Sequence, residues 1–170
     1  FRISNCAKPT IARIQGAALG GGVGLTCACD IAIAADNASF AVSEAKFGIL
    51  PSVIGPHVIN AVGKRHATRL ALTTSRIGAA EALAMGMVSQ VVPLSQLDDT
   101  LEQAIDELLA ASPNAQREIK ALFANLEQQE ITPAVLDLTA NTIACVRGTR
   151  EAKEGFAAFL EKRPAPWMLG

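Results

Sequence analysis

The run Gly16-Ala-Ala-Leu-Gly-Gly-Gly-Val-Gly24 is the feature of this 170-residue sequence that most restricts its fold. It follows an apolar stretch with strand character at residues 10–15 and precedes small, apolar residues with helix character at 23–29. Three consecutive glycines allow a tight turn, and a ligand can approach their main chain without meeting a Cβ atom. The first amides of a helix are unpaired and lie at the positive end of its dipole. The segment therefore predicts a turn that binds an anion or a developing oxyanion, or one that only permits close helix packing.

Two familiar phosphate-binding patterns do not fit this turn. The dinucleotide fingerprint GxGxxG needs a third glycine where Leu25 stands. The phosphate-loop pattern needs GK[ST], but Gly63-Lys64 is followed by Arg65. The glycine run is therefore not assigned to a nucleotide phosphate on its spacing.

The remaining pattern predicts an α/β part followed by a purely helical part. Short strands are expected at residues 31–35, 39–42 and 88–92, helices at 64–73 and 79–85, and a loop region over the fifteen residues from Gly48. From residue 95 onward helices alone are expected, because four capping signals precede apolar stripes. These signals are Ser95 with Asp98, Ser112 before Pro113, Thr132 before Pro133, and Thr149 before Arg150. The chain thus divides into residues 1–93 and 94–170.

Charge and composition limit the classes of partner. The whole chain has 15 basic and 16 acidic side chains, but residues 1–93 carry eight basic and four acidic ones, so an anionic ligand should favour that part. No basic run has interleaved aromatic residues, and we expect no nucleic-acid partner. The longest uncharged run, residues 14–29, is too short and too rich in glycine to span a membrane.

Cysteine and histidine spacing gives no metal or disulfide signature. The cysteines at positions 6, 27, 29 and 145 form no CxxC pair, so we expect reduced, mostly buried thiols and a reducing, cytoplasmic location. His57 and His66 belong to no HExxH pattern, and no metal site is expected. The sequence opens at Phe1 without an initiator methionine, which favours a fragment or a processed chain.

Glu44 is the candidate acid–base residue. It is the only carboxylate between Asp36 and Glu81, and its neighbours Val42 and Ala45 are apolar, so its side chain should be partly shielded from water. A shielded carboxylate suits general acid–base work, although a surface or capping role fits the spacing equally well. Near the C-terminus, aromatic and basic side chains gather that suit an adenine ring and its phosphates, or only a packed helix end: Phe156, Phe159, Lys162, Arg163 and Trp167.

Three segments resemble the enoyl-CoA hydratase/isomerase, or crotonase, superfamily, and the resemblance is collinear along nearly the whole chain. They read IQGAALGGGVGLTCACDIAIAADNASFAVSEAKFGILPSVIGP, RLALTTSRIGAAEALAMGMVSQVVP and EGFAAFLEKR. The resemblance implies an α/β fold with a ββα spiral core, of which residues 1–93 are a part lacking its N-terminal portion. It further implies that residues 94–170 are a helical region for trimerisation and CoA contact.

The resemblance also implies roles for individual residues. The amide of Gly21 matches the second donor of the family's oxyanion hole, and Glu44 matches the second catalytic glutamate. Gly24 stands where the hydratases have the first glutamate, and the first oxyanion donor belongs to a segment upstream of these residues. The stretch at residues 51–56 departs from the family's glycine-rich pattern and should reshape the acyl pocket. The residues expected to contact substrate are Gly20, Gly22, Gly24, Phe159 and Lys162.

The implied activity is that of an enoyl-CoA hydratase, which adds water to a 2-enoyl-CoA thioester or removes it. The run GGGVGL with glycine at the first acid position is similar to that of bacterial methylglutaconyl-CoA-type hydratases. The alternatives are a Δ3,Δ2-enoyl-CoA isomerase, which also uses the second glutamate alone, and a catalytically silent acyl-CoA-binding member. The resemblance implies no separate cofactor, because coenzyme A is part of the substrate, and a homotrimer or a hexamer of two trimers.

Overall fold

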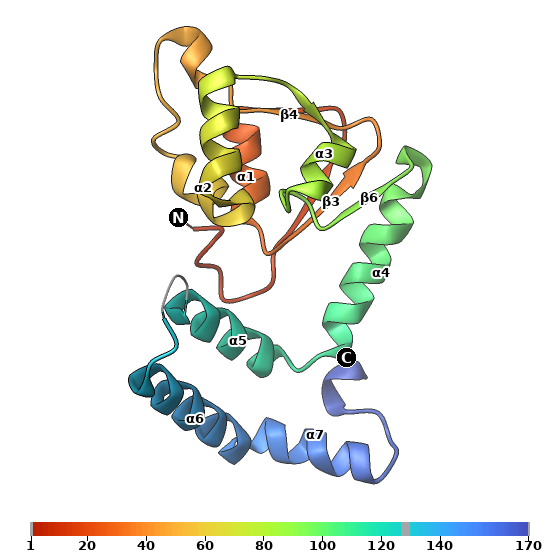
Figure 1. Cartoon of the computed structure of the whole chain (residues 1–170). Coiled ribbons are helices and arrows are strands. Elements are labelled where there is room, and N and C mark those ends of the chain that lie inside the picture. Colours follow the sequence, from red (N-terminus) through yellow and green to blue (C-terminus); the bar gives the residue numbers. More distant parts are fainter. Residues whose placement is uncertain (1, 127–129, 170) are drawn as a thin grey trace. The chain divides into compact units, whose positions relative to one another are not determined.

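The computed structural model describes residues 2–126 and 130–169 and contains two compact units, one ending at Ala104 and the other beginning at Ile105. The division falls inside helix α4 (Leu97–Ala110), later in the chain than the change of pattern at residue 93. Figure 1 follows the elements along the chain. No helix among the described residues has both the length and the apolar character needed to cross a membrane.

The first unit holds two small sheets with their connecting helices. Its strands are β1 (Ile11–Ile14), β2 (Ala17–Leu19), β3 (Ile31–Ala35), β4 (Ser39–Ala41), β5 (Ile77–Gly78) and β6 (Gln90–Val92). Its helices are α1 (Gly21–Ala28), α2 (Gly55–Thr73), α3 (Ala79–Ala84) and the start of α4, with 3₁₀ turns η1 (Glu44–Phe47) and η2 (Leu94–Gln96).

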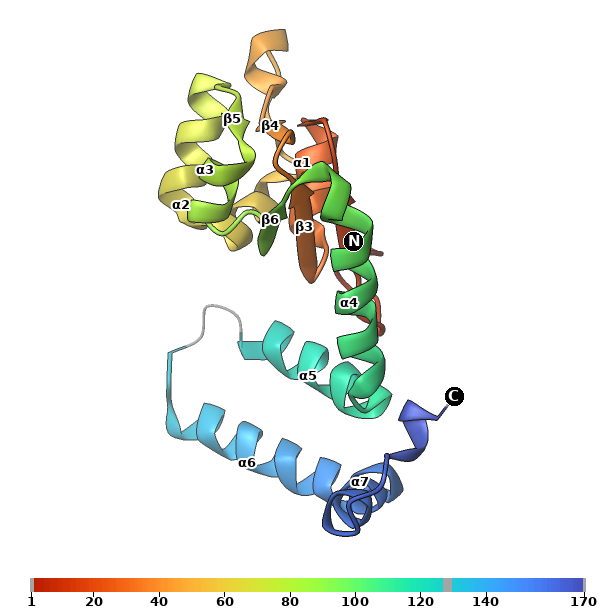
Figure 2. The same ribbon diagram turned by 90° about the vertical axis from the view of Figure 1, so that its right-hand side faces the viewer.

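The strand order is β1-β3-β6 in one sheet and β2-β4-β5 in the other. All pairs of the first sheet are parallel, and β3 and β6 lie side by side in both views (Figures 1 and 2). In the second sheet β2 pairs with β4 in parallel, whereas β4 and β5 are antiparallel. Parallel pairs need long connections, and here α1 leads from β2 toward β3.

The core of this unit explains why the apolar runs become strands. In the run Ile31–Ala35 the last four residues are buried, as expected for a strand covered on both faces. The side chains of Phe40 and Leu70 are almost entirely removed from water. Burial of one such side chain stabilises a fold by about 1.5–3 kcal/mol. The two sheets are thus anchored by residues that the sequence places at regular strand and helix positions.

The loop region predicted to begin at Gly48 is shorter than expected, because helix α2 begins within it. The helix begins at Gly55, with Pro56 in its first turn, whereas the sequence pattern predicts a helix only from Lys64. Proline within the first helical turn has no intrahelical hydrogen bond to lose, so Pro56 marks a start here rather than a break. Gly63 has φ 74° and interrupts the helix, which explains why its two halves differ in sequence pattern.

Two short strands, β2 and β5, are further differences from the prediction. Residues 17–19, expected to be part of a glycine-rich turn, form β2, and Ile77–Gly78 forms β5. The residues of β2, Ala-Ala-Leu, include no β-branched or aromatic side chain, and β5 has only two residues, so neither segment shows strand character in the sequence. The strands predicted around residues 10–15, 31–35, 39–42 and 88–92 are confirmed as β1, β3, β4 and β6.

The second unit is helical, as the sequence predicts. It contains α5 (Pro113–Leu126), α6 (Pro133–Gly148), α7 (Arg150–Leu160) and the 3₁₀ turn η3 (Pro166–Met168), and α6 packs against both α5 and α7 (Figure 2). Three of the predicted caps form. The hydroxyls of Ser112, Thr132 and Thr149 accept hydrogen bonds from main-chain amides three residues ahead, at 3.0, 3.3 and 3.2 Å.

Two predictions need correction. Ser95 lies inside η2 and does not cap α4, and Asp98 instead forms an ion pair with Arg13, at 2.6 Å. The arginine lowers the pKa of Asp98. All four cysteines are free thiols, but Cys145 is exposed and the other three are half-buried, so the thiols are less buried than predicted.

Candidate active site

The candidate site begins where two parallel strands end together. Leu19, the last residue of β2, pairs with Ala41, the last residue of β4. The amide of Gly20 extends this pairing by donating to the carbonyl of Ala41 at 2.9 Å. Because the carboxyl ends of parallel strands meet at one edge of a sheet, the segments that follow are neighbours. The glycine turn and the segment leading to Glu44 are therefore held side by side by main-chain hydrogen bonds.

The start of α1 presents unpaired amides at this edge. Gly20 precedes the helix with φ 48°, a left-handed conformation that favours glycine. Its carbonyl accepts from the amides of Val23 and Gly24, at 3.0 and 3.2 Å. In the described chain, no backbone carbonyl outside α1 accepts from Gly21 or Gly22. These two amides remain at the positive end of the helix, where an oxyanion would be stabilised.

Glu44 lies directly against this turn. It is the first residue of η1, and a Cβ atom added to Gly20 would lie 3.3 Å from its Oε1 atom and 3.7 Å from its Cδ atom. Its Oε2 atom is buried and has no hydrogen-bond partner among the described residues. A buried carboxylate oxygen without a donor is costly, and such groups concentrate at functional sites. Glu44 therefore combines shielding from water with an oxygen available to exchange a proton.

Gly24 occupies a position where the structure has no room for a side chain. A Cβ atom added there would lie 2.3 Å from Cγ2 and 2.8 Å from Cβ of Ile54, which precedes α2. Ile54 is not among the site residues predicted from the sequence. The sequence feature that could have indicated Ile54 is the altered stretch at residues 51–56, which places a branched apolar residue at position 54.

The predicted nucleotide-contacting residues lie in the other unit. Phe159 is the penultimate residue of α7 and 79% exposed. Lys162 follows that helix with φ 55°, and its amide donates to the carbonyl of Phe159 at 3.3 Å. The predicted site residues thus form two groups. Phe159 and Lys162 lie close together in the second unit, and Gly20 and Glu44 lie close together in the first unit. A role for Phe159 and Lys162 in CoA binding stays a prediction.

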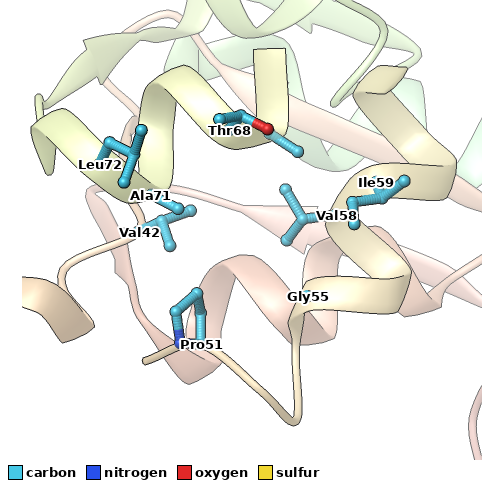
Figure 3. Close-up of a pocket in the computed structure, with 9 residues that line it drawn as sticks. Val42, Pro51, Gly55, Val58, Ile59, Thr68, Ala71 and Leu72 are labelled. Carbon is cyan, nitrogen blue, oxygen red and sulfur yellow. The ribbon is translucent and has the colours of Figure 1, made fainter. Parts of the chain in front are cut away.

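An apolar pocket of about 220 Å³ opens at the bend of α2. Figure 3 shows Val58 from the first half of the helix on the side that faces Val42 and Ala71, and Leu72 lies beside Ala71 in the second half. The altered stretch contributes Pro51 and Gly55. Since Val42 is two residues before Glu44, the wall of the pocket lies within about 8 Å of the main chain of the acid.

The remaining polar groups do not form a metal site. Among residues 2–126 and 130–169, no three His, Cys, Asp or Glu side chains are grouped so that they could hold a metal ion. Burial raises the pKa of the Cys27 thiol to about 12, so this cysteine is a poor nucleophile at neutral pH.

The fold and the site define an α/β protein with a main-chain turn that can stabilise an oxyanion and an adjacent carboxylate. The family model for enoyl-CoA hydratase/isomerase matches residues 1–169, and the chain belongs to this family. The crotonase superfamily predicted from sequence is therefore confirmed.

Individual relatives agree with this assignment. The chain is 33% identical over 177 residues to carnitinyl-CoA dehydratase of Escherichia coli, covering 97% of the chain and 65% of that protein. It is 42% identical to an enoyl-CoA hydratase structure from Shewanella pealeana, with a TM-score of 0.93 over 98% of the chain and 62% of that structure. An enoyl-CoA hydratase/isomerase structure from Marinobacter aquaeolei is 38% identical, with a TM-score of 0.92 and coverages of 98% and 63%. The chain thus spans less than two thirds of the length of these relatives, and its fold is theirs.

Proposed function

We propose that the protein carrying this chain is an enoyl-CoA hydratase with Glu44 as its single acid–base residue and the amide of Gly21 as an oxyanion donor. The observation that carries the proposal is the position of the Glu44 carboxylate against Gly20, with its Oε2 atom buried and unpartnered among the described residues. An acid next to the unpaired amides of a helix start supports chemistry at the α- and β-carbons of a thioester.

In this mechanism the thioester oxygen accepts a hydrogen bond from the amide of Gly21. That bond withdraws electrons and makes C3 of the enoyl group electrophilic. The carboxylate of Glu44 accepts a proton from water while the water oxygen bonds to C3, and the C2–C3 double bond shifts its electrons to form the enolate. The protonated Glu44 then donates its proton to C2, which restores the thioester and the carboxylate. The cycle needs no cofactor, since coenzyme A belongs to the substrate.

The reaction direction and the substrate belong to the proposal as well. The name of the Escherichia coli relative, carnitinyl-CoA dehydratase, denotes removal of water from a CoA thioester, which supports hydro-lyase chemistry over double-bond migration. The glycine at position 24 supports a methylglutaconyl-CoA-type hydratase. The apolar pocket at the bend of α2 is our candidate for the acyl chain, because its wall at Val42 lies so close in the chain to the acid.

A Δ3,Δ2-enoyl-CoA isomerase is the second candidate. One carboxylate beside an oxyanion donor is sufficient to move a proton from C2 to C4 of the same acyl chain. Among the described residues Glu44 is the acid that lies against this turn, and Ile54 occupies the space that a side chain at position 24 would need. The two activities differ in whether water enters the product.

The homotrimer or hexamer is also proposed. Large apolar side chains are exposed on the helices of the second unit, including Ile119, Phe123, Ile143 and Phe156. Exposed apolar side chains are common at protein interfaces, and we propose that further copies of the chain cover them.

The deciding experiment replaces Glu44 with glutamine in the full-length protein. We expect kcat on enoyl-CoA thioesters, followed by loss of enoyl absorbance, to fall about 10²–10⁴-fold with little change in KM. Following the acyl protons by NMR in H₂O and D₂O then separates addition of water from double-bond migration. Full turnover by the Glu44→Gln variant contradicts the proposed role of Glu44. A wild-type protein that binds acyl-CoA without turnover is a silent binder and contradicts the proposed activity.

A further inference from the structure

Ile54 and Gly24 form the tightest approach at any described glycine. A Cβ atom on Gly24 would meet the Cγ2 and Cβ atoms of Ile54 at 2.3 and 2.8 Å. Both residues are buried, and Ile54 keeps 9% of its surface exposed. The two segments, α1 and the start of α2, pack against each other at this point.

The contact with the Cβ atom of Ile54 decides how strictly a side chain at position 24 is excluded. Rotation about χ1 moves Cγ2 away from position 24, but the Cβ atom is fixed by the main chain. A side chain at position 24 therefore requires the loss of the Ile54 Cβ atom or a shift of the helix itself. Close-packed interiors resist such a shift.

The same contact lies one helical turn from the acid. Gly20 directly precedes α1, and Gly24 is the fourth residue of that helix. The Glu44 carboxylate lies against Gly20, and Ile54 lies against Gly24. Glu44 and Ile54 therefore contact positions 20 and 24, four residues apart at the start of α1.

We propose that Ile54 is a specificity-determining residue that keeps the site to a single acid by filling the space of any side chain at position 24. The consequence for catalysis rests on the proposed function of Glu44, whereas the steric exclusion does not. Position 54 thereby controls whether α1 can contribute a second proton-transferring group.

The steric part is tested by thermal unfolding of the full-length protein. Gly24→Ala should lower Tm by about 2–12 °C, because the core is overpacked. Gly22→Ala is the matched control in the same helix, since its Cβ atom would meet only the Cβ of Ala18, at an ordinary 3.6 Å. This control should leave Tm unchanged or raised, because alanine favours a helix more than glycine does.

Double variants show which atom is responsible. In Gly24→Ala/Ile54→Ala the Cγ2 atom is gone but the Cβ contact at 2.8 Å remains, so the loss should be relieved only in part. The Tm of Gly24→Ala/Ile54→Gly should equal that of Ile54→Gly alone, because no Ile54 side-chain atom remains to meet the alanine. Equal Tm values for Gly24→Ala and Gly22→Ala, or full relief by Ile54→Ala, overturn the exclusion. If Gly24→Ala does not accumulate as folded protein, the two double variants are compared for recovery of folded protein instead of Tm.

The catalytic part is tested in the Glu44→Gln background. Gly24→Glu/Ile54→Gly should raise turnover at least about tenfold above Glu44→Gln alone, a part of the 10²–10⁴-fold that a positioned acid contributes. The isosteric pair Gly24→Gln/Ile54→Gly should give no rise, because an amide transfers no proton. Folded glutamate and glutamine variants with equal turnover overturn the role of Ile54 in specificity. A Glu44→Gln protein that retains full turnover overturns the proposed function instead, and the unfolding experiments still decide the exclusion.

Discussion

The amide of Gly21 can be removed without changing any side-chain contact. Gly21 is the first residue of α1, its φ is not positive, and a Cβ atom added to it would meet nothing within 4 Å. Proline is favoured at the first helical position, and it disfavours a helical conformation in the preceding residue. Gly20 has φ 48° and ψ −112°, which is not helical. Gly21→Pro should therefore fold and lose one N–H group at the proposed oxyanion site.

The magnitude follows from the value of one oxyanion donor. Removal of such a donor costs about 2.7–4 kcal/mol of transition-state stabilisation, or about 10²–10³ in kcat. We expect this loss in kcat with a smaller change in KM, because the charge on the oxygen develops in the transition state. Gly21→Ala keeps the N–H group, and its loss should stay below about tenfold.

The assay measures kcat and KM from loss of enoyl absorbance, and Tm verifies that both variants are folded. Both variants add a Cβ atom, so alanine controls for that atom, and proline additionally replaces the N–H hydrogen with its ring carbons. A folded Gly21→Pro variant with kcat within about threefold of Gly21→Ala would refute the assignment of this amide as an oxyanion donor.

Two further predictions concern the first unit. Folding raises the pKa of Cys27 from its ordinary value of 9.0 to about 12, so its thiolate fraction at pH 8 should fall about a thousandfold on folding. Alkylation of Cys27 by iodoacetamide, followed by peptide mass spectrometry, should be slower in the native protein than in urea by about that factor. The stability that depends on a protonated Cys27 thiol is fully present below pH 9 and is lost as the pH rises toward 12. Equal labelling rates in the native protein and in urea would contradict the burial of Cys27. Gly63→Ala should destabilise the protein by about 1–2 kcal/mol in urea unfolding, because Gly63 has φ 74° inside α2 and alanine is strained there. Gly55→Ala, at a residue without positive φ and with open space around its Cβ position, is the matched control, and equal losses would argue against strain at the bend.

Long periodic segments and capping residues were readable from the sequence. The helices that begin after Ser112, Thr132 and Thr149 form as predicted, because each cap acts through a hydrogen bond three residues away. The apolar run at 31–35 becomes β3 for a similar reason, since continuous apolar character predicts a strand buried on both faces. Local chemistry is sufficient for such elements.

Elements and contacts that depend on distant residues were not readable. Residues 17–19 form a strand because β4 lies beside them, and Ala-Ala-Leu has no β-branched or aromatic residue that would predict one. Pro56 reads as a helix breaker until the start of α2 is known. For the site, the acid and the turn were both identified by residue type, but the approach of Ile54 to Gly24 depends on how α1 and α2 pack and cannot be read from either segment alone.

The hydrogen bond from Gly20 to Ala41 has a consequence for the motion of the site. It closes the β2–β4 ladder between the glycine turn and the segment that carries Glu44. We expect displacement of one strand to carry the other with it, so that Glu44 and the first amides of α1, the proposed proton carrier and oxyanion donor, move together. Fluctuations that open the rest of the molecule would leave their separation unchanged until this rung itself breaks.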